Sequence, residues 1–346
     1  MARSGQRDQS IDRVRELLES AGFYVSDAHR IRPTAFDLIA RRDSLLLIVK
    51  VLKNIDALDP EEAERLQELS RLFGASMVLV GQTSGAAKLE PGVVYNRYGV
   101  PIVVEESLRE YLSKGVPPFL FSSPGGIFAR IDGERLRALR ELHRLSLGAL
   151  AGVAGVSRRT IQLYEEGAGA EISVIDRIER YLGEPIALPI ELFRAPPPGP
   201  RPDRDDEEEE EDEEDDDELP RPGPSRPRGP IPTGDPLRDN VFRQLDGMGW
   251  QVVVTVRCPF DAFSSGALPG GEEILLTAVG SLRSAEHRAE LLQEIARVAE
   301  GHALYVVTGV EGHRSIDGLP ILTVHELRRH RDPRALIEEI AGRESA

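Results

Sequence analysis

The chain has 346 residues, of which 40% are hydrophobic and 29% are charged, with one cysteine and a formal net charge of −16 at pH 7. This length exceeds one ordinary domain and predicts about two to three of them. The lone Cys258 excludes an intrachain disulfide framework and a cysteine-based zinc site, and no stretch has the apolar length of a membrane span. We therefore expect a cytoplasmic protein without membrane contact.

The negative charge is concentrated in one short stretch. Residues 203–218 contain fifteen acidic residues and one arginine, and they carry −14 of the net charge. Because the rest of the chain is close to neutral, the overall acidity does not exclude a nucleic-acid partner.

Hydrophobic periodicity in residues 1–115 predicts alternating helices and strands. Four apolar residues between 11 and 18 have helical spacing, and Gly22 follows them as a stop signal. This alternation indicates an α/β layer domain. Apolar runs and turn signals predict strands at 23–25, 36–40, 45–52, 75–80 and 101–104, and helices at 60–73 and 105–112.

Two polar residues stand out within the predicted strands of this domain. Asp37 follows Phe36 in one strand, and Lys50 interrupts the apolar run 45–52 after a polar turn. This arrangement resembles the PD-(D/E)XK nuclease fold, in which two acids hold magnesium and the lysine assists attack on a phosphate. The resemblance places Asp37 and Lys50 at matching positions, but Ile48 stands where the family has its second metal-ligating acid.

Loss of that ligand predicts an inactive nuclease-like domain with no catalytic residue, no metal and no cofactor. Asp37 and Lys50 would then form a salt bridge or polar pair in a fold used for structure or dimerisation. The alternative is a DNA-processing enzyme with a residual metal site at Asp37 and Lys50. Glu16 or Glu19 on the first helix could contribute a carboxylate, but neither restores the missing ligand.

Residues 116–130 (VPPFLFSSPGGIFAR) are rich in proline and glycine, and we expect them to connect this domain to the next one. Their apolar side chains indicate that the connector packs against a neighbouring surface. These side chains are Phe119, Leu120, Phe121, Ile127 and Phe128.

Residues 131–194 are predicted to form a small all-α domain around the stretch LSLGALAGVAGVSRRTIQLYEEG at 145–167. Ser146 can cap one helix and Ser157 a second one, with Gly155 at the corner between them. Further helices are expected at 133–144 and around 172–182. Apolar residues occupy the places where two short crossing helices must touch. They are Leu150, Ala151, Val156 and Ile161.

These residues resemble the helix-turn-helix of the Cro/repressor (XRE-like) family. In that family the second helix of the motif enters the major groove and presents its first residues to base edges. The resemblance implies a recognition helix at about 157–165, with arginine suited to guanine. Leu147 and Leu163 depart from the family, which often has polar DNA-contacting side chains there. The implied DNA-binding residues are Ser157, Arg158, Arg159, Thr160 and Gln162.

The net charge of this domain does not decide its partner. Residues 130–184 contain nine basic and nine acidic residues, so bulk electrostatics would not give strong DNA binding. The DNA interpretation therefore requires that the arginines gather on one face. A compact bundle or a protein-binding module is the alternative, and the Arg158–Arg159 pair directly after the cap favours DNA.

Residues 195–233 are rich in proline and acidic residues and are predicted to be a disordered linker. The simplest role is a solvated spacer. In the alternative role, the acidic run mimics the charge of DNA and competes for the arginine face or for another basic partner.

Residues 234–346 repeat the first domain in the order of their predicted elements. Asp261 parallels Asp37, and Val279 stands where the first copy has Lys50. The sequence DGLPILTVHELRRH at 317–330 is also similar to YGVPIVVEESLREY at 98–111. We infer a divergent internal duplication, whose second copy retains still less of a nuclease site.

The predicted fold is multidomain, α/β plus all-α, with a central Cro-like bundle flanked by two related α/β domains and an acidic linker. This layout resembles archaeal helix-turn-helix transcriptional regulators, which implies a sequence-specific DNA-binding regulator and not an enzyme. One recognition helix reads few base pairs, so we expect a homodimer on an inverted repeat in double-stranded DNA. A nuclease-like enzyme and a protein-interaction adaptor remain the alternatives.

Overall fold

The computed structural model describes residues 2–27, 34–194, 230–268, 271–308 and 314–344, and the acidic stretch 203–218 lies outside them. The chain forms two compact units. The first unit comprises Met1–Phe23, Val49–Gln67 and Ser76–Arg194, and the second comprises Tyr24–Ile48, Glu68–Ala75 and Ala195–Ala346.

The N-terminal region alternates helices and strands, as its periodicity predicts. Each expected element is present, and the short strands β5 and β6 are additional. The elements are α1 (Ala2–Ser20), β1 (Tyr24–Asp27), β2 (Leu38–Arg42), β3 (Leu45–Asn54), the 3-10 helix η2 (Ile55–Ala57), α2 (Pro60–Leu72), β4 (Ser76–Ser84), β5 (Ala87–Lys88), β6 (Val93–Arg97), β7 (Val100–Val103) and α3 (Glu105–Lys114).

Strand β3 is the centre of this region. Its residues from Leu46 to Val51 are all buried, on both faces of the strand. A strand that is covered on both sides has a continuous apolar sequence instead of an alternating one, which explains the unbroken run before Lys50. The strand order continues from it as β3-β4-β7-β6, with β4 and β7 parallel and β6 and β7 antiparallel.

The segment expected to connect the two domains contains a hairpin of β8 (Leu120–Ser123) and β9 (Gly126–Ile131). Its turn uses two glycines with positive φ, 102° at Gly125 and 150° at Gly126. Strand β8 pairs in parallel with β6, so the sheet extends into this segment. Proline and glycine near a tight turn are compatible with a hairpin as well as with a linker.

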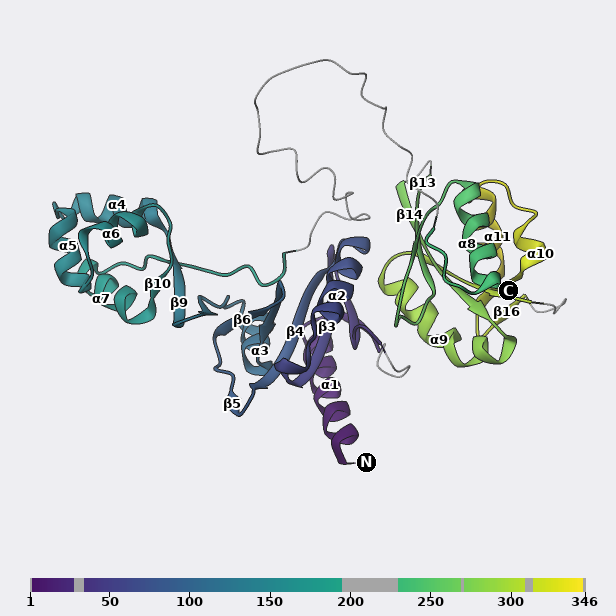
Figure 1. The fold of residues 1–346 in the computed structure, drawn as a ribbon, viewed down its shortest axis with the longest axis horizontal. Coiled ribbons are helices and arrows are strands. Elements are labelled where there is room, and N and C mark those ends of the chain that lie inside the picture. The colour runs from purple at the N-terminus through teal and green to yellow at the C-terminus, as the bar shows by residue number, and fades with distance from the viewer. Residues whose placement is uncertain (1, 28–33, 195–229, 269–270, 309–313, 345–346) are drawn as a thin grey trace, which may run out of the picture. The chain divides into compact units, whose positions relative to one another are not determined.

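Beyond the hairpin, helices form a small bundle that Figure 1 shows as a distinct body. One glycine is required here, because a Cβ at Gly133 would lie 2.4 Å from the backbone oxygen of Glu165. The backbone at Gly133, where one helix starts, therefore lies against the backbone at Glu165, where another helix ends. The elements are α4 (Gly133–Leu142), α5 (Leu147–Ala154), α6 (Arg158–Glu165), β10 (Ala170–Glu171), α7 (Ile172–Leu182) and β11 (Ala187–Leu188).

The second unit contains a further sheet covered by helices. Its apolar core joins α8 and α11 to the strands, with Phe242, Trp250, Leu275, Leu304 and Ile340 all buried. The elements are α8 (Pro236–Met248), β12 (Gln251–Val254), β13 (Ala262–Leu268), β14 (Gly271–Gly280), α9 (Leu282–Val298), β15 (His302–Val307), β16 (Ser315–Ile316), β17 (Leu319–Thr323), α10 (Val324–Leu327) and α11 (Pro333–Glu344).

The strand order in this sheet is β12-β13-β14-β15-β17-β16. The N-terminal region has the order β1-β2-β3-β4-β7-β6, which is the same when strands are matched by their place in the chain. The directions agree as well, since β15 and β17 are parallel and β16 and β17 are antiparallel. Within the described residues, no helix is long and apolar enough to cross a membrane.

Candidate nucleic-acid interface

The helix-turn-helix is fixed by two serine caps and one glycine. Ser146 Oγ accepts the backbone N–H of Ala149 at 3.1 Å, and Ser157 Oγ accepts that of Thr160 at 3.0 Å. Gly155 ends α5 in the left-handed conformation with φ 69°, where a side chain would be strained. These local signals end α5 and start α6 within three residues, as the sequence predicts.

The second helix of the motif, α6, has a buried side and an exposed side. Ile161 is fully buried in the core of the bundle, together with Leu150 and Ala154 of α5. Arg158 and Arg159 are exposed on the other side. The helix is therefore held by its apolar stripe, and its polar residues are left available to a ligand.

The five residues implied by the family resemblance lie together at the start of α6. Arg159 donates a hydrogen bond to Gln162 Oε1 at 3.3 Å, and the hydroxyls of Ser157 and Thr160 are 2.8 Å apart. Arg158 makes no hydrogen bond or ion pair with any residue that the structure describes. An exposed guanidinium without a protein partner keeps its donors for another acceptor.

An open groove of about 730 Å³ runs beside this helix. Four arginines and two glutamates are among the residues that line it, although the domain as a whole is neutral. The excess of positive charge thus gathers on one face, which the DNA interpretation requires. The lining residues are Arg137, Arg140, Glu141, Leu147, Arg158, Arg159, Gln162 and Glu165.

A buried ion pair ties α6 to α4 at the floor of this groove. Arg140 donates to both carboxylate oxygens of Glu165, at 2.5 and 3.2 Å, and to the backbone oxygen of Leu145 at 3.0 Å. Arg137 adds a contact of 3.3 Å to the same carboxylate. The hydrogen bond to Glu165 raises the pKa of Arg140 although burial opposes its charge. The carboxylate of Glu165 thus orients both Arg137 and Arg140, which line the groove.

The residues that resemble a nuclease site, Asp37, Ile48 and Lys50, are all buried. Lys50 is buried, and its Nζ lies 2.6 Å from Oε1 of Glu62 in α2. Asp37 is buried directly before β2, and Ile48 is buried in β3. The carboxylate opposite the lysine therefore comes from a helix and not from the strand position at which the nuclease family has its glutamate.

Comparison with known proteins agrees with both resemblances. Residues 7–118 match the PD-(D/E)XK superfamily domain, and residues 136–188 match a helix-turn-helix family. A relative from Halorubrum lacusprofundi is 33% identical over 343 residues, which cover 98% of each chain. Its name is "Putative HTH-type transcriptional regulatory protein".

The chain belongs to this family of archaeal regulatory proteins. A member from Methanocella arvoryzae is 33% identical over 339 residues, covering 98% of this chain and 97% of its own. A third, from Archaeoglobus fulgidus, is 33% identical over 296 residues, covering 86% and 85%. Both have the same name as the first, and no solved structure matches the chain.

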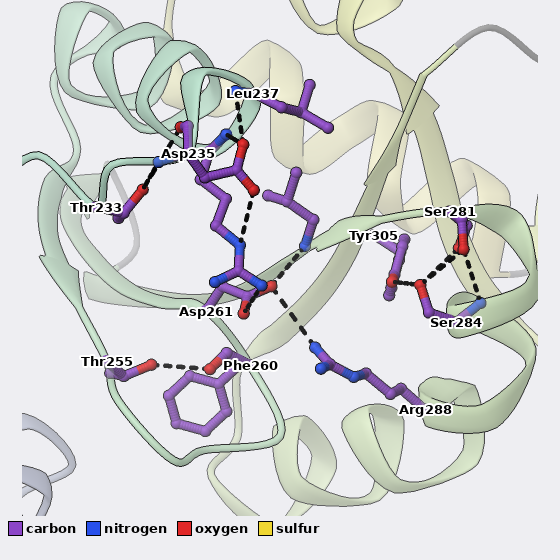
Figure 2. A network of polar contacts seen from close by, with 12 residues as sticks. Thr233, Asp235, Leu237, Thr255, Phe260, Asp261, Ser281, Ser284, Arg288 and Tyr305 are labelled. Carbon is purple, nitrogen blue, oxygen red and sulfur yellow. Dashed lines mark hydrogen bonds and ion pairs between the residues drawn. The ribbon is translucent and has the colours of Figure 1, made fainter.

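In this family member, Asp261 lies at the position that parallels Asp37. Two arginines approach its carboxylate, Arg238 from α8 at 3.1 Å and Arg288 from α9 at 3.6 Å. Figure 2 shows Asp261 with Arg288 beside it. The backbone N–H of Val279 donates to the same carboxylate at 2.8 Å. Guanidinium groups therefore surround the carboxylate of Asp261, whereas a metal-binding site would need further acidic side chains there.

The side chains present do not fit the magnesium ion that the nuclease fold implies. A hard cation requires several oxygen ligands, and the described residues contain no cluster of three His, Cys, Asp or Glu side chains that could hold one. The buried Ile48 offers no oxygen ligand, and Lys50 is already paired with Glu62. No metal-dependent step is therefore derived for this chain.

No local sequence pattern distinguishes Arg137, Arg140 and Glu165 from other charged residues. Arg140 and Glu165 are separated by 25 positions, so no helical or strand spacing relates them. The only available signal is that Glu165 falls on the same side of α6 as the buried Ile161, where a charged residue requires a partner.

Proposed function

We propose that this chain is a sequence-specific DNA-binding transcriptional regulator in which α6 enters the major groove. The observation that carries the proposal is the gathering of four arginines on one groove of a neutral domain, with Arg158 unpaired among the described residues. The family name of its relatives supports the same conclusion.

Each polar residue at the start of α6 has a proposed role. Arg158, Arg159 and Gln162 contact base edges, because exposed guanidinium and amide groups can form paired hydrogen bonds with bases. Ser157 and Thr160 lie at the helix N-terminus, where phosphate oxygens are favoured. Arg137 lines the same groove and contacts the DNA backbone, whereas Arg140 is largely buried in its ion pair with Glu165 and holds α6 against α4.

We further propose a homodimer on an inverted repeat, because one short helix covers only a few base pairs. Half-sites would then lie about 10 base pairs apart, which is one turn of B-DNA. The two α/β regions have no catalytic role in this proposal, since the acid positions of a nuclease site are occupied by Ile48 or paired with arginines. We assign the domains as 1–115, the segment 116–130, 131–194, the linker 195–233 and 234–346.

The test is selection of bound duplexes from a random library with the full-length protein at physiological salt. Wild type should enrich an inverted repeat, and Arg158→Ala/Arg159→Ala should abolish the enrichment. Each lost bidentate contact should cost about 1–3 kcal/mol. The matched control is Arg135→Ala/Arg180→Ala, which removes the same charge from arginines that pair with Glu184 and Asp176 outside the groove.

The control variant should select the same repeat as wild type. If the Arg158→Ala/Arg159→Ala variant also selects it, α6 is not the reading helix. If wild type enriches no sequence, the proposal of a sequence-specific regulator that acts alone is overturned.

A further inference from the structure

Within the second unit, residues from the N-terminal α/β region pack against the C-terminal one. The end of α9 lies along β1 and β2. Ser26 in β1 is fully buried, and its hydroxyl is 3.1 Å from a carboxylate oxygen of Glu294. Arg297 donates to the hydroxyl of Tyr24 at 3.1 Å. Strand β1 thus contacts two successive turns of α9.

The next strand, β2, contributes one arginine to the same surface. Arg41 donates from Nε to the backbone oxygen of Val298 at 2.5 Å and forms an ion pair of 3.0 Å with Glu300. Val298 is the last residue of α9, so the guanidinium satisfies one of the carbonyl groups that a helix leaves unpaired at its end.

A reciprocal contact joins the counterparts of these elements. Phe73 directly follows α2, the helix that matches α9 in chain order. Its ring packs edge-on against Phe260 and Phe263, with centroid distances of 5.9 and 5.0 Å and an interplanar angle of 77° in both cases. Phe263 lies in β13, the strand that matches β2, so the end of each helix meets the corresponding strand of the other region.

The segments that precede the two matching aspartates also meet. The backbone N–H of Ala35 donates to the backbone oxygen of Arg257 at 2.7 Å. Ala35 is two residues before Asp37, and Arg257 is four residues before Asp261. A contact between equivalent loops, flanked by two reciprocal helix-strand contacts, is the pattern of an isologous, two-fold interface.

We infer that the two α/β regions of one chain form an internal pseudo-dimer, in which each region covers the corresponding face of the other. The partner of this interaction surface is therefore the other half of the same chain. The phenylalanine cluster is buried, as expected for a permanent interface. The homodimer that DNA binding requires must then form through a different surface.

This inference does not depend on DNA binding and can be tested separately. The full-length protein is made with a site for a specific protease within residues 205–218 and is cleaved completely. Before cleavage the tether holds the halves at about millimolar effective concentration, whereas afterwards only the interface holds them. At micromolar concentration, size-exclusion chromatography with light scattering should show one particle with the mass of the pieces combined.

A charge reversal in the interface provides the matched comparison. Arg41→Glu should weaken the association of the cleaved halves roughly tenfold or more, because it places a carboxylate against the carbonyl end of α9. Arg180→Glu is the control, since Arg180 is exposed and pairs with Asp176 in the helix-turn-helix domain. Separation of the wild-type halves at micromolar concentration would overturn the inference, and so would equal effects of the two substitutions.

A cross-link distinguishes pairing within a chain from pairing between chains. In a Cys258→Ser background, Tyr24→Cys/Arg297→Cys places two exposed cysteines across the contact between β1 and α9, and a short bismaleimide should join them within one uncleaved chain. After cleavage, the same cross-link should hold the two pieces together on a denaturing gel. A product with twice the chain mass would instead show exchange between chains, which contradicts an internal pair. Tyr24→Cys/Glu338→Cys, with its second cysteine on α11, should not cross-link.

Discussion

The start of α6 in the helix-turn-helix domain and the two α/β regions differ in whether their charged side chains have protein partners. In the former, Arg158 is exposed with no partner among the described residues, and Arg159 contacts only Gln162. In the latter, Lys50 forms an ion pair with Glu62, and Asp261 forms ion pairs with Arg238 and Arg288. Charge that is left free can serve a ligand, whereas paired and buried charge serves the fold. The difference supports the proposal that α6 is the recognition helix.

The helix-turn-helix domain also contains the buried ion pair of Arg140 and Glu165, and breaking it should have the largest effect on stability. Glu165→Ala leaves Arg140 largely buried without its carboxylate, which should cost about 3–5 kcal/mol of unfolding free energy. Denaturant unfolding of the full chain, followed by a probe in this domain, measures the loss. The exposed neighbour provides the control, and Glu166→Ala should change stability by less than about 0.5 kcal/mol. Equal stability of Glu165→Ala and wild type would show that the pair has no structural role.

A smaller loss is expected at the aspartate of the C-terminal region. Asp261→Ala removes the partner of two arginines and the acceptor of the Val279 N–H, which should cost about 2–3 kcal/mol because both guanidiniums remain partly exposed to water. Thermal unfolding with and without magnesium checks this, with the exposed Asp246→Ala as control. If magnesium stabilises wild type but not Asp261→Ala, the Asp261 carboxylate is a metal ligand. That result would contradict the statement that its charge serves only the fold.

The pairing of Glu326 gives a pH-dependent effect. Burial opposes its charge, but the Thr323 backbone N–H and Arg343 donate hydrogen bonds that lower the pKa from 4.5 to about 2. Because the folded pKa is below the unfolded one, this contribution to stability is present above pH 4.5 and is lost as the pH falls towards 2. Glu326→Gln should therefore cost about 2 kcal/mol at pH 7 and progressively less below pH 4.5.

Urea unfolding of wild type and Glu326→Gln at pH 7 and near pH 3.5 measures this difference. The exposed Glu338→Gln provides the control and should show little change between the two pH values. A constant difference between wild type and Glu326→Gln would mean that the carboxylate is not selectively stabilised in the folded state.

The helix-turn-helix could be predicted from sequence because its signals are local. Ser146, Gly155 and Ser157 each act within four residues of their own position. Strand β3 could be predicted for the same reason, from a continuous apolar run. Both the type and the approximate bounds of these elements follow from neighbouring residues.

Contacts between distant residues could not be predicted. The partners of Asp261 come from positions 238 and 288, on two different helices, and no sequence spacing brings them together. The hairpin at 120–131 shows a different difficulty, because proline and glycine content alone does not separate a turn from a linker. Tertiary packing decides both cases.

The most direct test of the contrast between α6 and the α/β regions combines binding and cleavage in one assay. The full-length protein is mixed with a duplex recovered by selection, in magnesium buffer, and the products are separated on native and denaturing gels. We predict that wild type shifts the duplex and leaves it intact, and that Arg158→Ala/Arg159→Ala does not shift it. Magnesium-dependent cleavage by wild type that is lost in Lys50→Ala would contradict the account and place the activity in the nuclease-like region.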